Sequence, residues 1–584
     1  MREIVRKLRY IFDRGDKFRL LGLMFMIVIG SFLELLGVGV FMPFINVIMD
    51  PSKIEESAFL SAVNSFFGFQ SIYSFLTVLA AAIALIYVVK NVYLCFMQNN
   101  MLKFSYKTRM KIAVRLLSTY MREPYTFHLR KNISEMQRCL ENDTMQFMLF
   151  VNASLQEIAE FAVCLTLGLY LFDTSHSITV TIVVLLGICI GFFALVSKKV
   201  STRLGKRNQY YRAKLFQWIN QGLGGIKEVK VLGREDYFIN SYRKNYKELI
   251  YGAKTNELLA AVPKYIVETV AIVGMLAAVV VKMYFGRREI QDFVPQLTVF
   301  AVAAFRLLPS VGKINAYTTN MMYSVPSVDL IYHDLREIDR EPGRAAETAY
   351  RHPEWKFHDR VELQNITYTY PDAEKPVLES VSMTLHYGET VAFIGSSGAG
   401  KTTLADIILG LLPPDAGRVL ADGYDVTSCM GDWHRQLGYI PQTIYLSDDT
   451  IRNNVAFGIQ EEQIDEQAVW RALEKAQLGD FVRTLEEGVQ TFVGDRGVRL
   501  SGGQRQRIGI ARALYHDPEI LVLDEATSAL DNETETAVME SIESLKGQKT
   551  MLIIAHRLTT IRNADMIYEV GHGGIARKAK EEIF

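Results

Sequence analysis

Long apolar stretches, separated by charged connections, occupy the first 325 residues of the chain. Six of these stretches are 19 residues or longer, close to the roughly 20 residues that a membrane-spanning helix requires. They cover approximately residues 20–49, 72–97, 145–172, 178–196, 258–285 and 293–322. We therefore expect an all-α membrane domain with six spans.

The hydrophobic pattern changes at about Val361, where short apolar runs begin to alternate with amphipathic stretches and glycine-rich turns. This alternation is typical of an α/β domain. The charged stretch 336–358 contains Pro342 and Pro353 and indicates a linker. We therefore expect a membrane domain over residues 1–335, a linker over 336–358 and an α/β domain over 359–584.

The charges of the connections predict which side of the membrane each one faces. Residues 103–138 and 198–254 are long and rich in Lys and Arg, whereas the connections near 50–71 and 173–177 are short and slightly acidic. By the positive-inside rule, the N-terminus, the two long connections and the α/β domain are cytoplasmic. We expect the long connections to continue the spans as helices.

Two amphipathic segments flank the first span. Residues 1–19 carry seven basic residues among apolar ones, which predicts a helix on the cytoplasmic membrane surface. Residues 52–68 begin with a capping-box pattern and repeat apolar positions at helical spacing, which predicts a short helix on the outer side. An ordinary structured loop explains residues 52–68 equally well.

The composition supports a membrane protein and argues against a nucleic-acid partner. Basic and acidic residues both number 64, so the chain has no net charge that would favour a polyanion. Apolar residues make up 49% of the chain, and the mean hydropathy is +0.10. The five cysteines show no metal-ligand spacing and are typical of buried residues in a reduced protein.

A phosphate-binding loop is the most informative motif. The apolar run Val391 to Ile394 leads into the spacing Gly395-x4-Gly400-Lys401-Thr402, after which a helix is expected. Backbone N–H groups of such a loop, the helix N-terminus and the lysine bind phosphate oxygens. The following hydroxyl is suited to hold Mg²⁺. A glycine-rich turn in an unrelated α/β domain is the alternative.

Two further motifs support nucleotide hydrolysis. The apolar run 520–523 ends in Asp524, suited to reach Mg²⁺, and Glu525, suited to activate the attacking water. Residues 500–504 open a helix and so form a second candidate anion-binding N-terminus. Two phosphate-binding loops in one domain suggest that two domains share each ATP.

The ordered set of these motifs resembles the ATPase of ATP-binding cassette (ABC) transporters. The resemblance implies a six-span exporter (type IV) fold followed by a P-loop nucleotide-binding domain, a homodimer, and ATP and Mg²⁺ as cofactors. It implies ATP binding by Tyr370, Gly395, Ser396, Gly398, Gly400, Lys401, Thr402, Thr403, Ser501, Gly502, Gly503, Gln504 and Asp531. It further implies catalytic roles for Glu525, His556 and Gln442, and Mg²⁺ binding by Thr402, Gln442 and Asp524.

In this resemblance Ser501 and Gly503 act across the dimer, on ATP held by the Lys401 loop of the other subunit. Because Glu525 is an intact acid, we expect active hydrolysis. Simpler explanations exist for two single residues. Tyr370 beside Pro371 is also typical of a strand end, and a lone His556 is usually an ordinary polar residue.

Basic residues within the apolar spans are candidates for substrate binding, since a charge at bilayer depth is costly and usually functional. They are Lys90, Lys264, Arg306 and Lys313. Lined up along a cavity, they would suit a phosphate or pyrophosphate group. The alternative is structural: Lys264 pairs with Glu268, Lys90 and Lys313 reach an interface, and Arg306 joins two helices.

The outer segment and the motifs around Lys264 and Arg306 are similar to those of lipid-linked oligosaccharide flippases of bacterial protein glycosylation, the PglK-like group. This resemblance implies an ATP-driven flippase in the bacterial inner membrane that moves a polyprenyl-pyrophosphate-linked oligosaccharide outward. Lys90, Lys264 and Lys313 stand where that group has arginines, which puts the identity of the substrate's head group in question. A multidrug or lipid A-like ABC exporter shares the architecture and is the alternative.

Overall fold

The computed structural model describes residues 2–40, 44, 47–48, 54, 60–61, 64–65, 71–174, 176–285, 294–339, 354–371, 373–525, 532–555 and 561–583. The chain divides into two compact units. The first comprises Met1–Met121 and Lys131–Glu341, and the second comprises Arg122–Arg130 and Pro342–Phe584.

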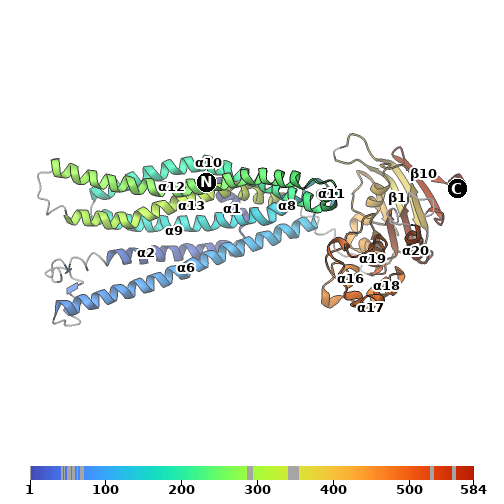
Figure 1. Ribbon diagram of the computed structural model, residues 1–584, viewed down its shortest axis with the longest axis horizontal. Coiled ribbons are helices and arrows are strands. Elements are labelled where there is room, and N and C mark those ends of the chain that lie inside the picture. Colours follow the sequence, from blue (N-terminus) through green and yellow to red (C-terminus); the bar gives the residue numbers. More distant parts are fainter. Residues whose placement is uncertain are drawn as a thin grey trace. The chain divides into compact units, whose positions relative to one another are not determined.

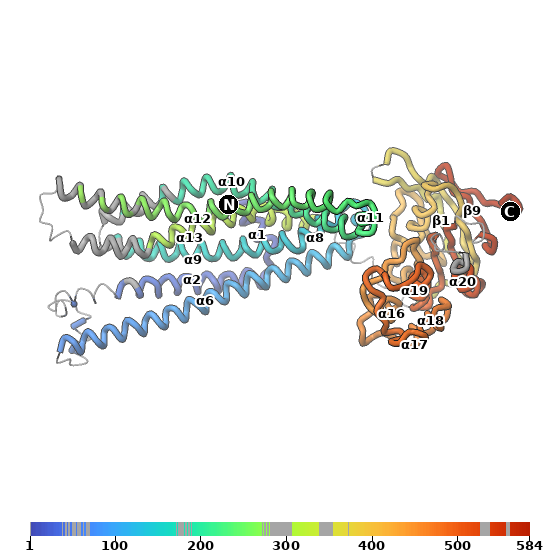
Figure 2. The backbone as a smooth tube through the Cα atoms, viewed as in Figure 1, coloured from blue at the N-terminus to red at the C-terminus, as the bar shows by residue number. Residues whose placement is uncertain are grey.

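The first unit is helical, as the apolar pattern predicts (Figure 1). Its helices are α1 (Arg2–Ile11), α2 (Arg14–Gly39), α6 (Ile72–Arg122), α8 (Ile133–Arg138), α9 (Thr144–Thr174), α10 (His176–Gly224), α11 (Ile226–Val231), α12 (Glu235–Phe285) and α13 (Val294–Asp339), with a π-helical turn, η1 (Cys139–Asp143), before α9. Figure 2 shows α9, α10, α12 and α13 running side by side, and α2 lying along α6.

The long helices confirm that the charged connections continue the spans. The helix α6 has 51 residues, and α13 has 46. A helix of that length extends about 70 Å, more than twice the hydrocarbon thickness of a bilayer. In the described part of the chain, three helices are long and apolar enough to cross a membrane, at 14–37, 72–122 and 133–170.

The outer segment predicted as a helix at 52–68 falls mostly outside the described residues. Two of its described residues, Ile54 and Leu60, are buried in a cluster with Val47 and Phe75.

A buried carboxylate joins four helical segments near the start of α9. Asp143 is fully buried, and its side chain accepts hydrogen bonds from Ser327 of α13 (2.7 Å), Gln209 of α10 (2.9 Å) and Arg138 of α8 (3.0 Å). A buried carboxylate is tolerated only when such donors compensate its lost hydration. The contacts therefore fix the register of α8, α10 and α13 against the π-helical turn that carries Asp143.

The helices α10 and α13 pack closely against each other at Gly205. A Cβ atom at Gly205 would lie 2.0 Å from the carbonyl oxygen of Tyr323, whereas a Cβ atom at Gly191 of the same helix would meet nothing within 4 Å. Because overpacking costs about 1–3 kcal/mol, we expect Gly205→Ala to lower the thermal midpoint of the purified protein. Gly191→Ala is the matched control and should leave the midpoint unchanged or raised. Equal midpoints for the two variants would contradict this packing.

The second unit contains two sheets. The larger has the order β10-β9-β3-β8-β7-β6, with parallel pairing from β9 to β6, and the smaller is antiparallel, in the order β2-β1-β4-β5. The strands are β1 (Arg360–Tyr368), β2 (Leu378–His386), β3 (Thr390–Ile394), β4 (Ala416–Ala421), β5 (Tyr424–Asp425), β6 (Leu437–Ile440), β7 (Ile520–Asp524), β8 (Thr550–Ile554), β9 (Met566–Gly571) and β10 (Gly574–Lys578).

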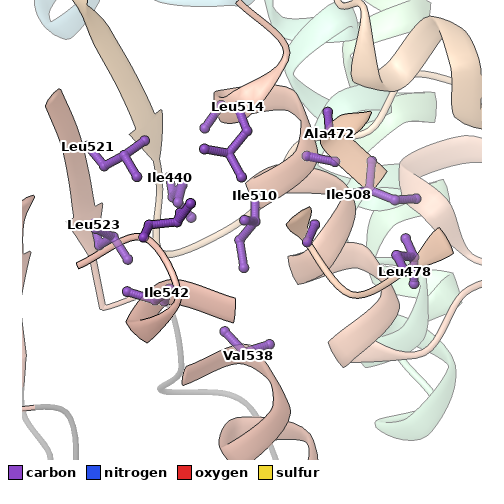
Figure 3. Close-up of a cluster of buried hydrophobic side chains, with 14 of the residues drawn as sticks. Ile440, Ala472, Leu478, Ile508, Ile510, Leu514, Leu521, Leu523, Val538 and Ile542 are labelled. Atoms are coloured by element: carbon purple, nitrogen blue, oxygen red, sulfur yellow. The ribbon is translucent and has the colours of Figure 1, made fainter. Parts of the chain in front are cut away.

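The helices of the second unit are α7 (Tyr125–Arg130), α14 (Lys401–Ile408), α15 (Met430–Gln436), α16 (Ile451–Val455), α17 (Glu466–Lys475), α18 (Gly479–Thr484), α19 (Gly502–Leu514) and α20 (Asn532–Glu543). The helix α19 links the sheet to the other helices through its buried face. In Figure 3, Leu514 and Ile510 lie toward Leu521 of β7, while Ile508 lies toward Ala472 of α17. The sheet and the helical part therefore share one core.

The observed division differs from the predicted domain boundaries in two places. The segment 122–130, which includes α7, groups with the α/β unit although it lies within the predicted membrane domain. In addition, α13 continues to Asp339, past the predicted start of the linker at 336, because residues 336–339 contain no helix-breaking proline or glycine.

Candidate nucleotide-binding site

The candidate site is built at the carboxyl ends of neighbouring parallel strands, where α/β sheets bind their ligands. The strand β3 leads directly into the loop 395–400 and then into α14. The strand β7 ends at Asp524, and β6 ends shortly before Gln442. The sheet thus brings together three motifs that are far apart in the sequence.

The loop conformation requires its glycines. Gly395, Gly398 and Gly400 have φ angles of +137°, +79° and +102°, a region that side chains disfavour. A Cβ atom at Gly395 would lie 2.2 Å from the carbonyl oxygen of Val570, so no other residue fits there. The loop closes on α14, whose first N–H groups are available to an anion.

Lys401 is the charged residue of this loop. Its side chain is buried, and Nζ donates hydrogen bonds to the carbonyl oxygens of Gly395 and Ser396, both at 2.9 Å. Burial lowers the pKa of Lys401, while the charges of Glu525 and Asp524 act in the opposite direction. The loop therefore holds a cation in the position that a phosphate group requires.

Tyr370 lies beside the same loop. Its hydroxyl is 3.0 Å from the hydroxyl of Thr403, the third residue of α14, and its ring packs edge-on against Tyr368. Thr402, in contrast, is exposed at the start of the helix. The ring of Tyr370 is thus held next to the phosphate loop, which suits the predicted contact with adenine.

The two acids after β7 occupy different environments. Asp524 is 8% exposed, whereas Glu525 is half-buried and accepts a hydrogen bond from the Gln442 side chain at 2.6 Å. Glu525 has a φ of +47°, and its N–H donates to the carbonyl oxygen of Ile554 at 3.1 Å. A non-glycine residue in this left-handed region is strained, and such strain collects at functional sites.

Asp406 on α14 was not among the predicted site residues. Burial, together with the charge of Asp524, raises the pKa of Asp406 to about 6. Burial raises the pKa values of Tyr125 and Tyr439. The nearby charge of Asp406 adds a smaller increase to both. The signal in the sequence was an acid one turn after Thr402 on a short, mostly apolar helix.

Because the pKa of Asp406 is raised, we expect the stability of the protein to depend on pH. An acid whose pKa is higher in the folded protein than the usual value of about 4 binds its proton more tightly when folded, so stability falls as the pH rises from about 4 to about 6. We expect Asp406→Asn to remove this loss. The thermal midpoint of the variant minus that of the native protein, measured without nucleotide, should rise across this interval and level off above it. The exposed Glu462→Gln is the control, and a constant Asp406→Asn difference from pH 4 to 7 would contradict the assignment.

The motif 500–504 begins a helix, as predicted. Ser501 caps α19: its hydroxyl accepts from the Gln504 N–H at 3.2 Å, and the Gln504 side chain accepts from the Ser501 N–H at 2.8 Å. Gly502 and Gly503 form the first turn. Among the described residues, no hydrogen bond or ion pair joins this motif to the loop 395–403.

Two predicted site residues, Asp531 and His556, lie outside the described residues. His556 follows β8, which lies between β3 and β7 in the sheet. Their roles stay predictions.

The four basic residues predicted for a substrate cavity belong to the first unit. Lys90 forms an ion pair with Glu34 (3.1 Å), and Lys313 forms one with Glu160 (2.6 Å). Lys264 is exposed, and the Arg306 side chain is not among those that the structure describes. Sequence reasoning did not pair Glu34 and Glu160 with these lysines, although acids within apolar spans were a visible signal.

Two family models match separate stretches of the chain. A family model described as ABC transporter matches residues 378–528, and one described as ABC transporter transmembrane region matches residues 20–307. The chain is 32% identical over 490 residues to an ATP-dependent lipid A-core flippase of Cupriavidus pinatubonensis, covering 82% of this chain and 79% of that protein. It is 30% identical over 479 residues to the protein of the same name from Escherichia coli, covering 81% and 80%.

A solved structure shares the fold. The bacterial Atm1-family ABC exporter with ATP bound superposes with a TM-score of 0.76 at 22% identity, covering 98% of this chain and 96% of that one.

Proposed function

Because this chain belongs to the ABC transporter family, in its half-size exporter form, and couples ATP hydrolysis to transport, we propose that it flips a lipid A-core type glycolipid outward across a bacterial inner membrane. The observation that carries this proposal is the combination of an ATPase site with a membrane unit whose relatives, over about four fifths of the chain, are named lipid A-core flippases. These relatives favour a lipid A-like substrate, the alternative reached from the sequence, over a polyprenyl-linked oligosaccharide.

In the proposed mechanism, each subunit binds ATP through its own residues. The loop 395–400 and the N-terminus of α14 receive the phosphates, and Lys401 adds a full charge to them. Tyr370 stacks on the base. Thr402, Asp524 and Gln442 offer the hydroxyl, carboxylate and amide oxygens that suit Mg²⁺, which when bound neutralises phosphate charge.

Glu525 is the proposed general base. Its carboxylate lies beside the Gln442 amide, so the two side chains can hold one water molecule between them and the phosphates. The site would be completed by His556 and Asp531. Ser501 and Gly503 would come from the partner subunit of a homodimer. Among the described residues no hydrogen bond or ion pair joins the Ser501 cap to the loop 395–403 of the same chain, which supports this second-subunit role.

The chemistry of the substrate explains the need for ATP. A phosphorylated, sugar-bearing head group loses strong hydration when it enters hydrocarbon, whereas its acyl chains remain in lipid throughout. Lys264 and Arg306 remain proposed contacts for the phosphates. For Lys90 and Lys313, a phosphate would have to compete with Glu34 and Glu160.

The proposal is tested by the lipid dependence of ATP hydrolysis in nanodiscs. We expect purified lipid A carrying core sugars to raise the steady-state rate severalfold above that in phospholipid alone. A polyprenyl-pyrophosphate oligosaccharide and a hydrophobic cationic drug are the comparison ligands. Stimulation by either of these, without stimulation by the lipid A ligand, would refute the proposed substrate class while leaving the ATPase assignment intact.

A further inference from the structure

A cavity of about 370 Å³ lies between α2 and the middle of α6, within the first unit. Three of its lining residues are basic: Arg19, Lys103 and Lys107. Its lining also includes the apolar residues Leu23, Met26 and Phe104. The cavity thus combines positive charge with a hydrophobic surface.

Two groups of contacts, made to α6 by α2 and by Asp13 just before it, bound the cavity along the helices. On one side, the Tyr93 hydroxyl donates to the Met26 carbonyl oxygen at 2.9 Å, and a Cβ atom at Gly30 would lie 3.1 Å from the Met97 sulfur. On the other side, Lys111 of α6 forms ion pairs with Asp13 and Asp16, at 2.8 Å for Asp16. These contacts hold α2 and α6 together on both sides of the cavity, so the space between the two helices is maintained.

The lining of the cavity carries a net positive charge, because its one acidic residue is already paired with a lysine. Asp16 is the acidic residue of the lining, and Lys111 compensates it from outside the lining. Arg19, Lys103 and Lys107 have no hydrogen-bond or ion-pair partner anywhere in the part of the chain that the structure describes. Three exposed cations thus converge on one space, a favourable environment for an anion.

The sequence pattern locates the cavity at the membrane surface. The apolar run of α2 begins at Leu20, directly after Arg19, and the apolar run of α6 gives way to basic residues at Lys103. Both helices therefore change from apolar to basic at the level of the cavity. The positive-inside rule assigns this level to the cytoplasmic leaflet.

We propose that this cavity binds one anionic glycerophospholipid of the cytoplasmic leaflet, with the phosphate against Arg19, Lys103 and Lys107 and the start of an acyl chain against Leu23, Met26 and Phe104. Basic pockets between membrane helices on the cytoplasmic side suit such head groups. A space of about 370 Å³ accommodates a glycerol-phosphate head group, whereas a sugar-bearing lipid A head group is much larger. The bound lipid would join α2 to α6 without being transported.

The test is a phosphatidylglycerol titration of the full-length protein in detergent, followed by native mass spectrometry. The double variant Lys103→Gln/Lys107→Gln should weaken binding about thirtyfold, because each basic residue near an anionic lipid contributes about a factor of five. Arg14→Gln/Lys17→Gln removes two exposed charges from the same end of α2, outside the lining, and should change binding by less than about threefold. Phosphatidylcholine should bind weakly to all forms.

Gly22→Leu provides a test that retains every charge. Gly22 lines the cavity, and a Cβ atom there would meet nothing within 4 Å, so a larger side chain has room to start at this position. We expect this variant to lose phosphatidylglycerol binding while its ATPase activity and thermal midpoint remain native. Equal losses in the two double variants, full binding by Gly22→Leu, or displacement of the bound lipid by one equivalent of lipid A-core would each overturn the proposal.

Discussion

Glu525→Gln should lower steady-state ATP hydrolysis by a factor of about a hundred or more while ATP still binds. A general base contributes about 10²–10⁴ to a rate, and an amide cannot accept the proton of the attacking water. Gln442 lies 2.6 Å from the Glu525 carboxylate and Glu525 is held in a strained backbone conformation, so the isosteric change leaves the surroundings in place. Phosphate release and equilibrium binding of a fluorescent ATP analogue measure the two effects separately.

The matched control for this prediction is Glu519→Gln. Glu519 immediately precedes β7, at the opposite end of the strand from Glu525, and forms an ion pair with Lys549. We expect this variant to hydrolyse ATP within about twofold of the native rate. If Glu525→Gln retained more than a tenth of native turnover, Glu525 would not be the base.

Lys401→Met should instead weaken ATP binding strongly. The buried ammonium group is held by two carbonyl oxygens of the loop, which positions a full charge where the phosphates are expected. Loss of one partner of a buried charge pair costs about 2–5 kcal/mol, which corresponds to a weakening of ATP affinity of roughly thirtyfold or more. Equilibrium dialysis with labelled ATP in the absence of Mg²⁺, where ATP is not hydrolysed, measures this loss directly.

Lys375→Met is the control for Lys401→Met, because Lys375 is an exposed lysine of the same unit. It should leave ATP affinity within about threefold of native. Native affinity in Lys401→Met would exclude the loop 395–400 as the phosphate site. Glu525→Gln and Lys401→Met therefore separate turnover from binding within one site.

The parts of the site that depend on local sequence were predictable. A loop with glycines at 395, 398 and 400 after an apolar run has few possible conformations, and the observed φ angles are those that glycine permits. The start of a helix at the motif 500–504 was predicted too, and the structure adds the Ser501–Gln504 capping box that fixes it. Helix lengths in the first unit followed from hydrophobic runs and charged extensions.

Long-range pairing set the limit of prediction. Lys90 meets Glu34 across 56 residues and Lys313 meets Glu160 across 153, and no local pattern specifies such partners. The same holds for Asp406, whose pKa depends on burial and on Asp524 of β7. The grouping of α7 with the second unit likewise depends on tertiary packing.

The substrate was the least predictable part. The motifs that favoured a polyprenyl-linked oligosaccharide consisted of a few charged residues and one amphipathic segment, which many lipid exporters could share. Relatives at 30–32% identity over most of the chain favour lipid A-core instead. Membrane cavities recognise large amphiphiles through shape and scattered charge, so sequence motifs carry little of that information.

The most direct measurement is lipid flipping in proteoliposomes containing fluorescently labelled lipid A-core, scored by the fraction of label accessible to a membrane-impermeant quencher. Protein molecules with outward-facing ATPase units are energised by added ATP and Mg²⁺, and they should move label from the outer to the inner leaflet. We expect an ATP-dependent loss of quenchable label that is absent in Glu525→Gln. Native ATP hydrolysis without any ATP-dependent change in quenchable lipid A-core, in vesicles that do translocate a labelled polyprenyl-pyrophosphate oligosaccharide, would contradict this expectation.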